Sequence, residues 1–184
     1  MLKALLSRRI DQFERTWTYD ASYMRELLAA SPWTFLKFSL VTGMVPRKDA
    51  PAAALAAAGI VGTLAEDCGP CVQISVDMAA AGGLTPEVLR AILAGDVQAM
   101  GPDAALGYGF ARAVLDRRLD EADAMRDQVL RRWGHRGLVA LTLALTTARI
   151  YPTVKYGLGH GRACSRVTVA GEAAPLRKPE ILAA

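Results

Sequence analysis

Three features of the sequence predict an all-α fold. Apolar residues near the N-terminus recur at helical spacing, proline follows a Ser or Thr helix cap at two expected helix starts, and no segment alternates apolar and polar residues as a half-buried strand does. The chain has 184 residues, and its hydrophobic content of 52% suffices for one compact core. We expect a single helical domain over residues 1–170.

The first 48 residues are expected to form a helical extension. An amphipathic pattern spans residues 2–17, and Asp20 is a suitable N-cap for the next helix. Ser31 followed by Pro32 is typical of a cap with proline at the first helical position. The third helix that starts there must end before Pro46.

The core of the domain is expected over residues 50–150. The predicted helices cover residues 52–65, 70–81, 86–95, 120–133 and 137–150, with a further helix starting at Pro102. The residues expected to face the core are Leu55, Ile60, Val61, Leu64, Ala105, Phe110, Val114 and Leu115. Pro152 and the glycines after it are expected to end the regular structure, residues 167–169 to form a short extended piece, and residues 171–184 a flexible tail.

Composition argues against secretion, membrane insertion and nucleic-acid binding. The N-terminal apolar run is too short for a signal peptide, and the longest apolar stretch, residues 36–45, is well short of the ~20 residues of a membrane span. The net charge of +4 comes from dispersed basic residues with acidic neighbours, and these form no basic stripe. We expect a soluble cytoplasmic protein with no bound cofactor.

A pair of closely spaced cysteines is the main chemical signal. Cys68-Gly69-Pro70-Cys71 opens the predicted helix over residues 70–81. The positive end of a helix lowers a thiol pKa from its usual ~8.5, and a second thiol three residues away can close a disulfide. Glu66 and Asp67 act in the opposite direction, since nearby carboxylates raise a thiol pKa, unless Asp67 caps the helix. The motif indicates a redox-active dithiol.

The residues around the dithiol distinguish between two known families that share a C-x-x-C motif. Cys-Gly-Pro-Cys is the active-site tetrapeptide of thioredoxins, which have a buried strand before it, whereas an Ala-rich helical run precedes it here. The sequence from Cys68 through the Gly82-Gly83 turn to Thr85-Pro86-Glu87 resembles that of the AhpD-like, or carboxymuconolactone decarboxylase-like, superfamily. Members of that superfamily have C-x-x-C opening a helix, then a small-residue turn and a capped helix. The resemblance covers roughly residues 50–150.

The resemblance implies a fold, an assembly and an activity. It implies an AhpD-like helical domain, here with extra N-terminal helices, and a homo-oligomer that is a trimer or a hexamer. It also implies thiol-dependent reduction of hydroperoxides, with a dithiol reductant as partner. On this analogy Cys71 is the peroxidatic thiol and Cys68 is its resolving partner.

Two positions depart from the family pattern. Ser75 stands where peroxidase members have a histidine four residues after the second cysteine, and Ala56 stands where they have a glutamate. Serine cannot act as a base near neutral pH, so the usual proton relay is missing. Glu66 and His135 are the two candidates to replace it, with His135 arriving from elsewhere in the fold or from a neighbouring subunit.

Other assignments of the same residues remain open. A zinc site is chemically acceptable, with its ligands drawn from Cys68, Cys71, His160 and Cys164. A third possibility is a non-catalytic AhpD-like oligomeric protein or redox sensor in which the dithiol does not turn over. Tyr19 and the three tryptophans are expected to be cap, core or interface residues.

Overall fold

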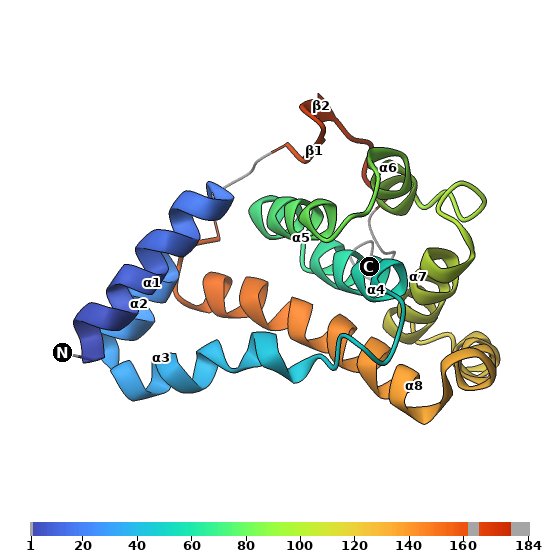
Figure 1. The fold of residues 1–184 in the computed structure, drawn as a ribbon, viewed down its shortest axis with the longest axis horizontal. Coiled ribbons are helices and arrows are strands. Elements are labelled where there is room, and N and C mark those ends of the chain that lie inside the picture. Colours follow the sequence, from blue (N-terminus) through green and yellow to red (C-terminus); the bar gives the residue numbers. More distant parts are fainter. Residues whose placement is uncertain (1, 162–165, 178–184) are drawn as a thin grey trace.

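The computed structural model describes residues 2–161 and 166–177, and these residues are predominantly helical (Figure 1). They form eight α-helices, one short 3-10 helix and one two-stranded hairpin. The elements are α1 Leu2–Trp17, α2 Ser22–Ala30, α3 Pro32–Ser39, η1 Val41–Met44, α4 Ala52–Ala65, α5 Gly69–Ala81, α6 Pro86–Ala94, α7 Pro102–Leu115, α8 Leu119–Gly157, β1 Thr168–Val169 and β2 Glu172–Ala173. The expected all-α class is confirmed.

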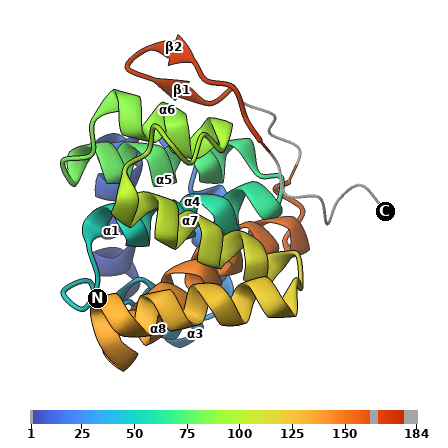
Figure 2. The same ribbon diagram turned by 90° about the vertical axis from the view of Figure 1, so that its right-hand side faces the viewer.

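Helix α4 is the centre of the main core. It packs against α5, α7 and α8, and both views show it enclosed by these helices (Figures 1 and 2). Its sequence is apolar on every side, which is typical of a helix buried all round. The four residues expected to face the core from this helix, Leu55, Ile60, Val61 and Leu64, are all buried.

Small residues bring the helices around α4 into close contact. A Cβ atom on Gly107 of α7 would lie 2.8 Å from the Cα atom of Ala54, and one on Gly62 would lie 2.8 Å from the carbonyl oxygen of Leu145 on α8. Neither position can take a side chain unless the helices move apart. Close packing on both sides fixes α4, and the turn after α4 carries the two cysteines.

The N-terminal helices form a second cluster on one side of the main core (Figure 1). Leu6 and Ile10 of α1 pack with Tyr23 and Leu28 of α2 and with Phe35 of α3. Ile74 of α5 and Val154 of α8 pack against this cluster as partly buried residues. The extension is therefore docked onto the part of the core that holds the cysteines.

Local signals in the sequence mark the start of α3, the start of α2 and the end of α6. The hydroxyl of Ser31 accepts a hydrogen bond from the backbone N–H of Thr34 at 3.2 Å, as the Ser-Pro signal predicts. The carboxylate of Asp20 accepts one from the backbone N–H of Ser22 at 2.9 Å, although the N-cap residue of α2 is Ala21. Gly95 ends α6 in the left-handed conformation with φ of 70°.

Helix α8 differs from the sequence expectation at its C-terminal end. The two predicted helices meet at a kink at Gly134, where φ is 65° and ψ is −171°, and the second one continues through Pro152 to Gly157. The expectation that Pro152 ends the regular structure is wrong. Proline removes the helical N–H that would bond to the carbonyl oxygen of Ala148, but Pro152 is buried in the packing of α8 and the helix continues to Gly157.

One residue that was expected in the core lies on the outer face of its helix. Val114 was expected to face the core and is 39% exposed, because it lies on the outer side of α7, whereas Phe110 and Leu115 are buried.

By length and mean hydropathy α8 could cross a membrane, but in this fold it packs along α4 and α7.

The short extended piece predicted at residues 167–169 is β1, which pairs antiparallel with β2. This hairpin lies beside α6 (Figure 2), where Arg90 donates to the carbonyl oxygen of Val169 at 3.2 Å.

Candidate dithiol site

The two cysteines lie at the first turn of α5. Cys68 is the N-cap residue of this helix, and Cys71 occupies its third helical position. A disulfide joins them, with 5.2 Å between their Cα atoms. The first N–H groups of a helix have no partner within the helix and carry its partial positive charge. After reduction, both sulfur atoms would lie where a thiolate is stabilised.

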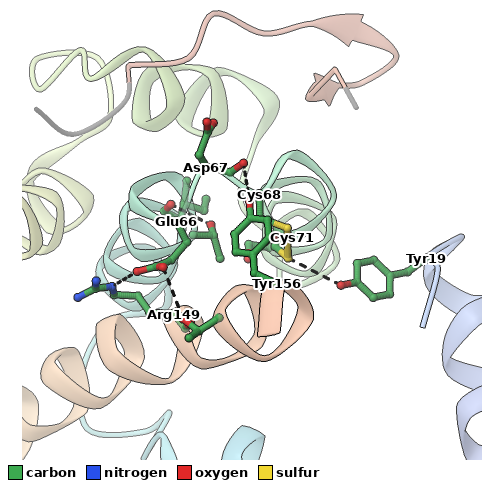
Figure 3. Close-up of a disulfide and its surroundings, with 11 residues drawn as sticks. Tyr19, Glu66, Asp67, Cys68, Cys71, Arg149 and Tyr156 are labelled. Atoms are coloured by element: carbon green, nitrogen blue, oxygen red, sulfur yellow. Dashed lines mark hydrogen bonds and ion pairs between the residues drawn. A yellow bond between two sulfur atoms is a disulfide. The ribbon is translucent and has the colours of Figure 1, made fainter. Parts of the chain in front are cut away.

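Cys71 contacts a tyrosine from the N-terminal extension. Both cysteines are buried, with exposures of 4% for Cys68 and 2% for Cys71. The hydroxyl of Tyr19 lies 3.8 Å from the sulfur of Cys71 (Figure 3). Burial raises the pKa of Tyr19, opposed by its hydrogen bond with Tyr23, so its hydroxyl keeps its proton at neutral pH. Tyr19 can donate that proton in a hydrogen bond to a thiolate.

A buried lysine lies against the same tyrosine. The side-chain nitrogen of Lys155 on α8 is 5.2 Å from the centre of the Tyr19 ring. Lys155 is only 1% exposed, and within the described residues its nitrogen has no hydrogen-bond partner. Burial lowers the pKa of Lys155, while the charge of Asp20 opposes that effect. An unpaired cation therefore lies on one side of the Tyr19 ring, and the Cys71 sulfur lies at the hydroxyl end of that ring.

The two acidic residues before the motif, Glu66 and Asp67, make different contacts. Glu66 points toward α8, where its carboxylate accepts a hydrogen bond from Arg149 at 2.6 Å (Figure 3). This ion pair offsets the negative charge next to the dithiol. The residue that caps α5 is Cys68, so the expectation that Asp67 caps this helix is wrong. The backbone carbonyl of Asp67 accepts a hydrogen bond from the Tyr156 hydroxyl at 2.8 Å.

A cavity of about 330 Å³ reaches one of the two sulfur-bearing residues. It lies between the N-terminal helices and the group α4, α5 and α8, and most of its lining is apolar. Cys71 is part of the lining and Cys68 is not. Pockets of this size and character bind small molecules in other proteins. A small molecule in this cavity would meet Cys71.

Both positions that depart from the family pattern line this cavity. Ala56 comes from α4 and Ser75 from α5. The Ser75 hydroxyl donates to the carbonyl oxygen of Cys71 at 2.9 Å, so its proton is directed at the backbone. Ser75 is one helical turn from Cys71, at the position where peroxidase members have a histidine, but serine supplies no base there.

His135 lies away from the dithiol in this chain. It is an exposed residue at the kink of α8, next to Gly134. At ~1.5 Å per residue along a helix, it is roughly 20 Å from Arg149, which adjoins the cysteine turn. A route to the site from a neighbouring subunit stays a prediction.

The proposed zinc ligands are only partly described. The Nε2 atom of His160 lies 2.9 Å from the carboxylate of Glu26, within hydrogen-bond distance, while Cys68 and Cys71 form the disulfide. Across residues 2–161 and 166–177, no group of three or more His, Cys, Asp or Glu side chains is arranged to hold a metal ion. Cys164 lies outside the described residues.

Sequence reasoning missed Tyr19 and Lys155 as members of the site. Tyr19 had been expected in a cap or core role, and Lys155 had no assigned role. The two residues lie in segments far apart along the chain, and they meet only through the docking of the N-terminal extension. Neither a motif nor a spacing in the sequence marks such a contact.

The chain matches no protein-family model, no curated protein and no solved structure. No comparison supports the AhpD-like assignment, which stays a prediction from the cysteine motif and the sequence around it.

Proposed function

We propose that this protein is a thiol–disulfide oxidoreductase that uses Cys71 as the attacking thiol and Cys68 as the resolving thiol. The observation that carries the proposal is that Cys71 lies at the start of α5, lines an apolar cavity and is joined to Cys68 by a disulfide. A substrate in the cavity reaches Cys71 first. Cys68 is then placed to form the disulfide that completes the half-reaction.

Three groups support a thiolate at Cys71 in the reduced protein. The helix N-terminus supplies partial positive charge, the Tyr19 hydroxyl supplies a hydrogen bond, and Lys155 supplies a full charge on the other side of the Tyr19 ring. Burial of the sulfur acts in the opposite direction, because desolvation disfavours the charged form. Tyr19 and Lys155 are thus positioning residues that offset the cost of burying the thiolate.

The same dithiol can reduce either of two substrate classes. With a disulfide, the Cys71 thiolate displaces one sulfur and forms a mixed disulfide, and Cys68 then releases the second sulfur as a thiol. With a hydroperoxide, Cys71 takes the terminal oxygen as a sulfenic acid while the alcohol leaves with a proton, and Cys68 then displaces water. A dithiol reductant returns the enzyme to its starting state in both reactions.

The proposal is tested by turnover with cysteine variants. Reduced protein is supplied with dithiothreitol and either cumene hydroperoxide or hydroxyethyl disulfide, and consumption of each substrate is followed. Cys71→Ser is expected to abolish turnover, Cys68→Ser to turn over more slowly, because dithiothreitol must then resolve the Cys71 intermediate in place of Cys68, and Cys164→Ser to turn over like the wild type. Equal rates in the wild type and Cys71→Ser would remove the catalytic claim and leave a redox sensor or a non-catalytic protein.

We also propose that the chain forms a homo-oligomer. Three large apolar side chains close together in sequence are well exposed, namely Trp33 at 67%, Leu40 at 65% and Met44 at 51%. They belong to α3, to the residue that follows it and to η1, and large exposed apolar side chains that gather on a surface are typical of interaction sites. Sedimentation is expected to give a trimer or hexamer for the wild type and a smaller species for Trp33→Ser. A monomeric wild type would contradict this.

A further inference from the structure

We propose that the cavity beside Cys71 binds a carboxylate ligand that carries an apolar chain, with the carboxylate at Arg47 and Tyr151 and the chain directed inward toward Cys71. The inference deepens the proposed function by naming the class of ligand, and it rests on that function only for what happens at the sulfur. Binding itself needs no thiol chemistry and can be measured in the disulfide form.

One end of the cavity carries an unpaired cation. Arg47 is the only charged side chain among the described residues that line the cavity, and no ion pair of the described residues includes it. Arg47 is exposed, as are Thr42 and Ala52 beside it, so this end of the cavity opens to solvent. An arginine side chain can bind both oxygens of a carboxylate at once.

A second donor, a tyrosine hydroxyl close to the Thr42 side chain, lies at the same end. The Tyr151 hydroxyl is buried and has no partner of ordinary hydrogen-bond geometry within the described residues. Burial raises the pKa of Tyr151 to about 12, against the smaller opposing effects of the Thr42 side chain and the Arg47 charge. The hydroxyl is therefore protonated at neutral pH, close enough to Arg47 to feel its charge, and able to donate to an anion.

The remainder of the lining fits an apolar chain. Residues contributed by α4, α5 and α8 toward the interior are small or aliphatic, among them Leu55, Ala56, Ile60, Ile74 and Ala144. The volume of about 330 Å³ is at the lower end of the range for ligand pockets, which is roughly 300–1,000 Å³. A few convergent polar groups at one end of an apolar pocket orient a ligand. The apolar tail is thereby placed nearest Cys71.

The test compares three probes on the disulfide form by isothermal titration below their aggregation concentrations. Decanoate has both features, decanol lacks the charge, and acetate lacks the chain. Decanoate is expected to bind at least about tenfold more tightly than decanol, and acetate is expected not to bind. Decanoate that binds no better than decanol, or fails to bind, would overturn the inference.

Variants locate the ligand. Arg47→Gln is expected to lower the affinity for decanoate about tenfold and to leave decanol unchanged, while Lys48→Gln, the matched loss of the neighbouring exposed charge, leaves both unchanged. Ala56→Leu, which fills the interior, is expected to weaken both probes. Equal affinities in Arg47→Gln and Lys48→Gln would overturn the assignment of the carboxylate.

Protection of the thiol links the ligand to the chemistry. In reduced Cys68→Ser protein, decanoate is expected to slow alkylation of Cys71 by iodoacetamide, and this protection should disappear in Arg47→Gln. An unchanged alkylation rate would overturn the proposed direction of the chain. If decanoate binds and protects while the protein fails to turn over any substrate, the oxidoreductase proposal falls and the binding site stands.

Discussion

The hydroxyl of Tyr19 lies 3.8 Å from the sulfur of Cys71, although 52 residues separate the two along the chain. This contact joins the N-terminal extension to the dithiol. Lys155 of α8 lies against the same tyrosine, with its side-chain nitrogen 5.2 Å from the centre of the ring. Under the proposed function, the reactivity of Cys71 would depend on the docking of helices that contain no cysteine.

Tyr19→Phe is expected to raise the pKa of the Cys71 thiol. A hydrogen bond to a charged group contributes ~1.5–3 kcal/mol. Since one pKa unit corresponds to ~1.4 kcal/mol, the expected rise is about one to two units. The rate of alkylation against pH in a Cys68→Ser background measures it. Tyr108→Phe, a buried tyrosine of α7 in the other core cluster, is the control and should leave the profile unchanged.

Lys155→Met is expected to stabilise the fold at neutral pH and to make Cys71 less reactive. Burial lowers the pKa of Lys155 below its ordinary 10.5, so the unfolded chain binds this proton more tightly than the folded protein does. The penalty for the charge is full below the folded-state pKa and fades as pH rises toward 10.5.

A gain of about 1–3 kcal/mol in the free energy of unfolding is thus expected at pH 7, where a buried unpaired group is removed, and a smaller gain at pH 10. Chemical denaturation at the two pH values measures it. Lys48→Met is the control, because Lys48 is exposed. A gain that is the same at both pH values would contradict an unpaired buried charge at this position.

Ser75→His is expected to increase hydroperoxide turnover. The new imidazole would line the cavity one turn from Cys71, and positioned acid–base catalysis contributes ~100-fold or more. Peroxide consumption with dithiothreitol measures the gain, and its dependence on pH should follow a group titrating near ~6.5. Ser75→Asn supplies a polar side chain without a base. If Ser75→Asn gives the same rate as Ser75→His, the missing histidine does not limit the reaction.

Gly107→Ala is expected to destabilise the fold, since its Cβ atom would lie 2.8 Å from the Cα atom of Ala54 on α4. Overpacking of this kind costs about 1–3 kcal/mol. Gly109→Ala on the same helix is the matched control, because there the new Cβ atom meets only the sulfur of the flexible Met125 side chain, at 3.2 Å. Thermal melts of both variants measure the difference. Similar melting temperatures would show that α4 and α7 can separate at little cost.

Most helix boundaries could be predicted because they depend on neighbours in sequence. Ser31 caps α3 with its side chain, Pro86 supplies a fixed φ at the start of α6, and Gly95 ends α6 in the left-handed conformation. Each of these effects acts within one helical turn. Pro152 was misjudged because proline usually ends a helix, whereas here it is buried and the tertiary packing of α8 outweighs the one backbone hydrogen bond that it removes. The buried face of α4 was also predictable, since a helix that is apolar on every side has to be enclosed.

The chemistry of the site was only half predictable. Cys68 and Cys71 can be recognised as a candidate dithiol by their spacing, and their place at a helix start follows from Gly69-Pro70. Tyr19, between α1 and α2, contacts Cys71, and Lys155 of α8 contacts Tyr19; such long-range contacts leave no local pattern in the sequence. The ion pair between Glu66 and Arg149, which offsets the charge beside the motif, is hidden for the same reason.

The most direct test of the central claim is the pKa of the Cys71 thiol in Cys68→Ser protein, obtained from its alkylation rate against pH. A helix start, the Tyr19 hydroxyl and the Lys155 charge together predict a value clearly below the ~8.5 of a free cysteine. A value at or above ~8.5 would mean that burial outweighs all three, and would contradict a reactive dithiol at this site.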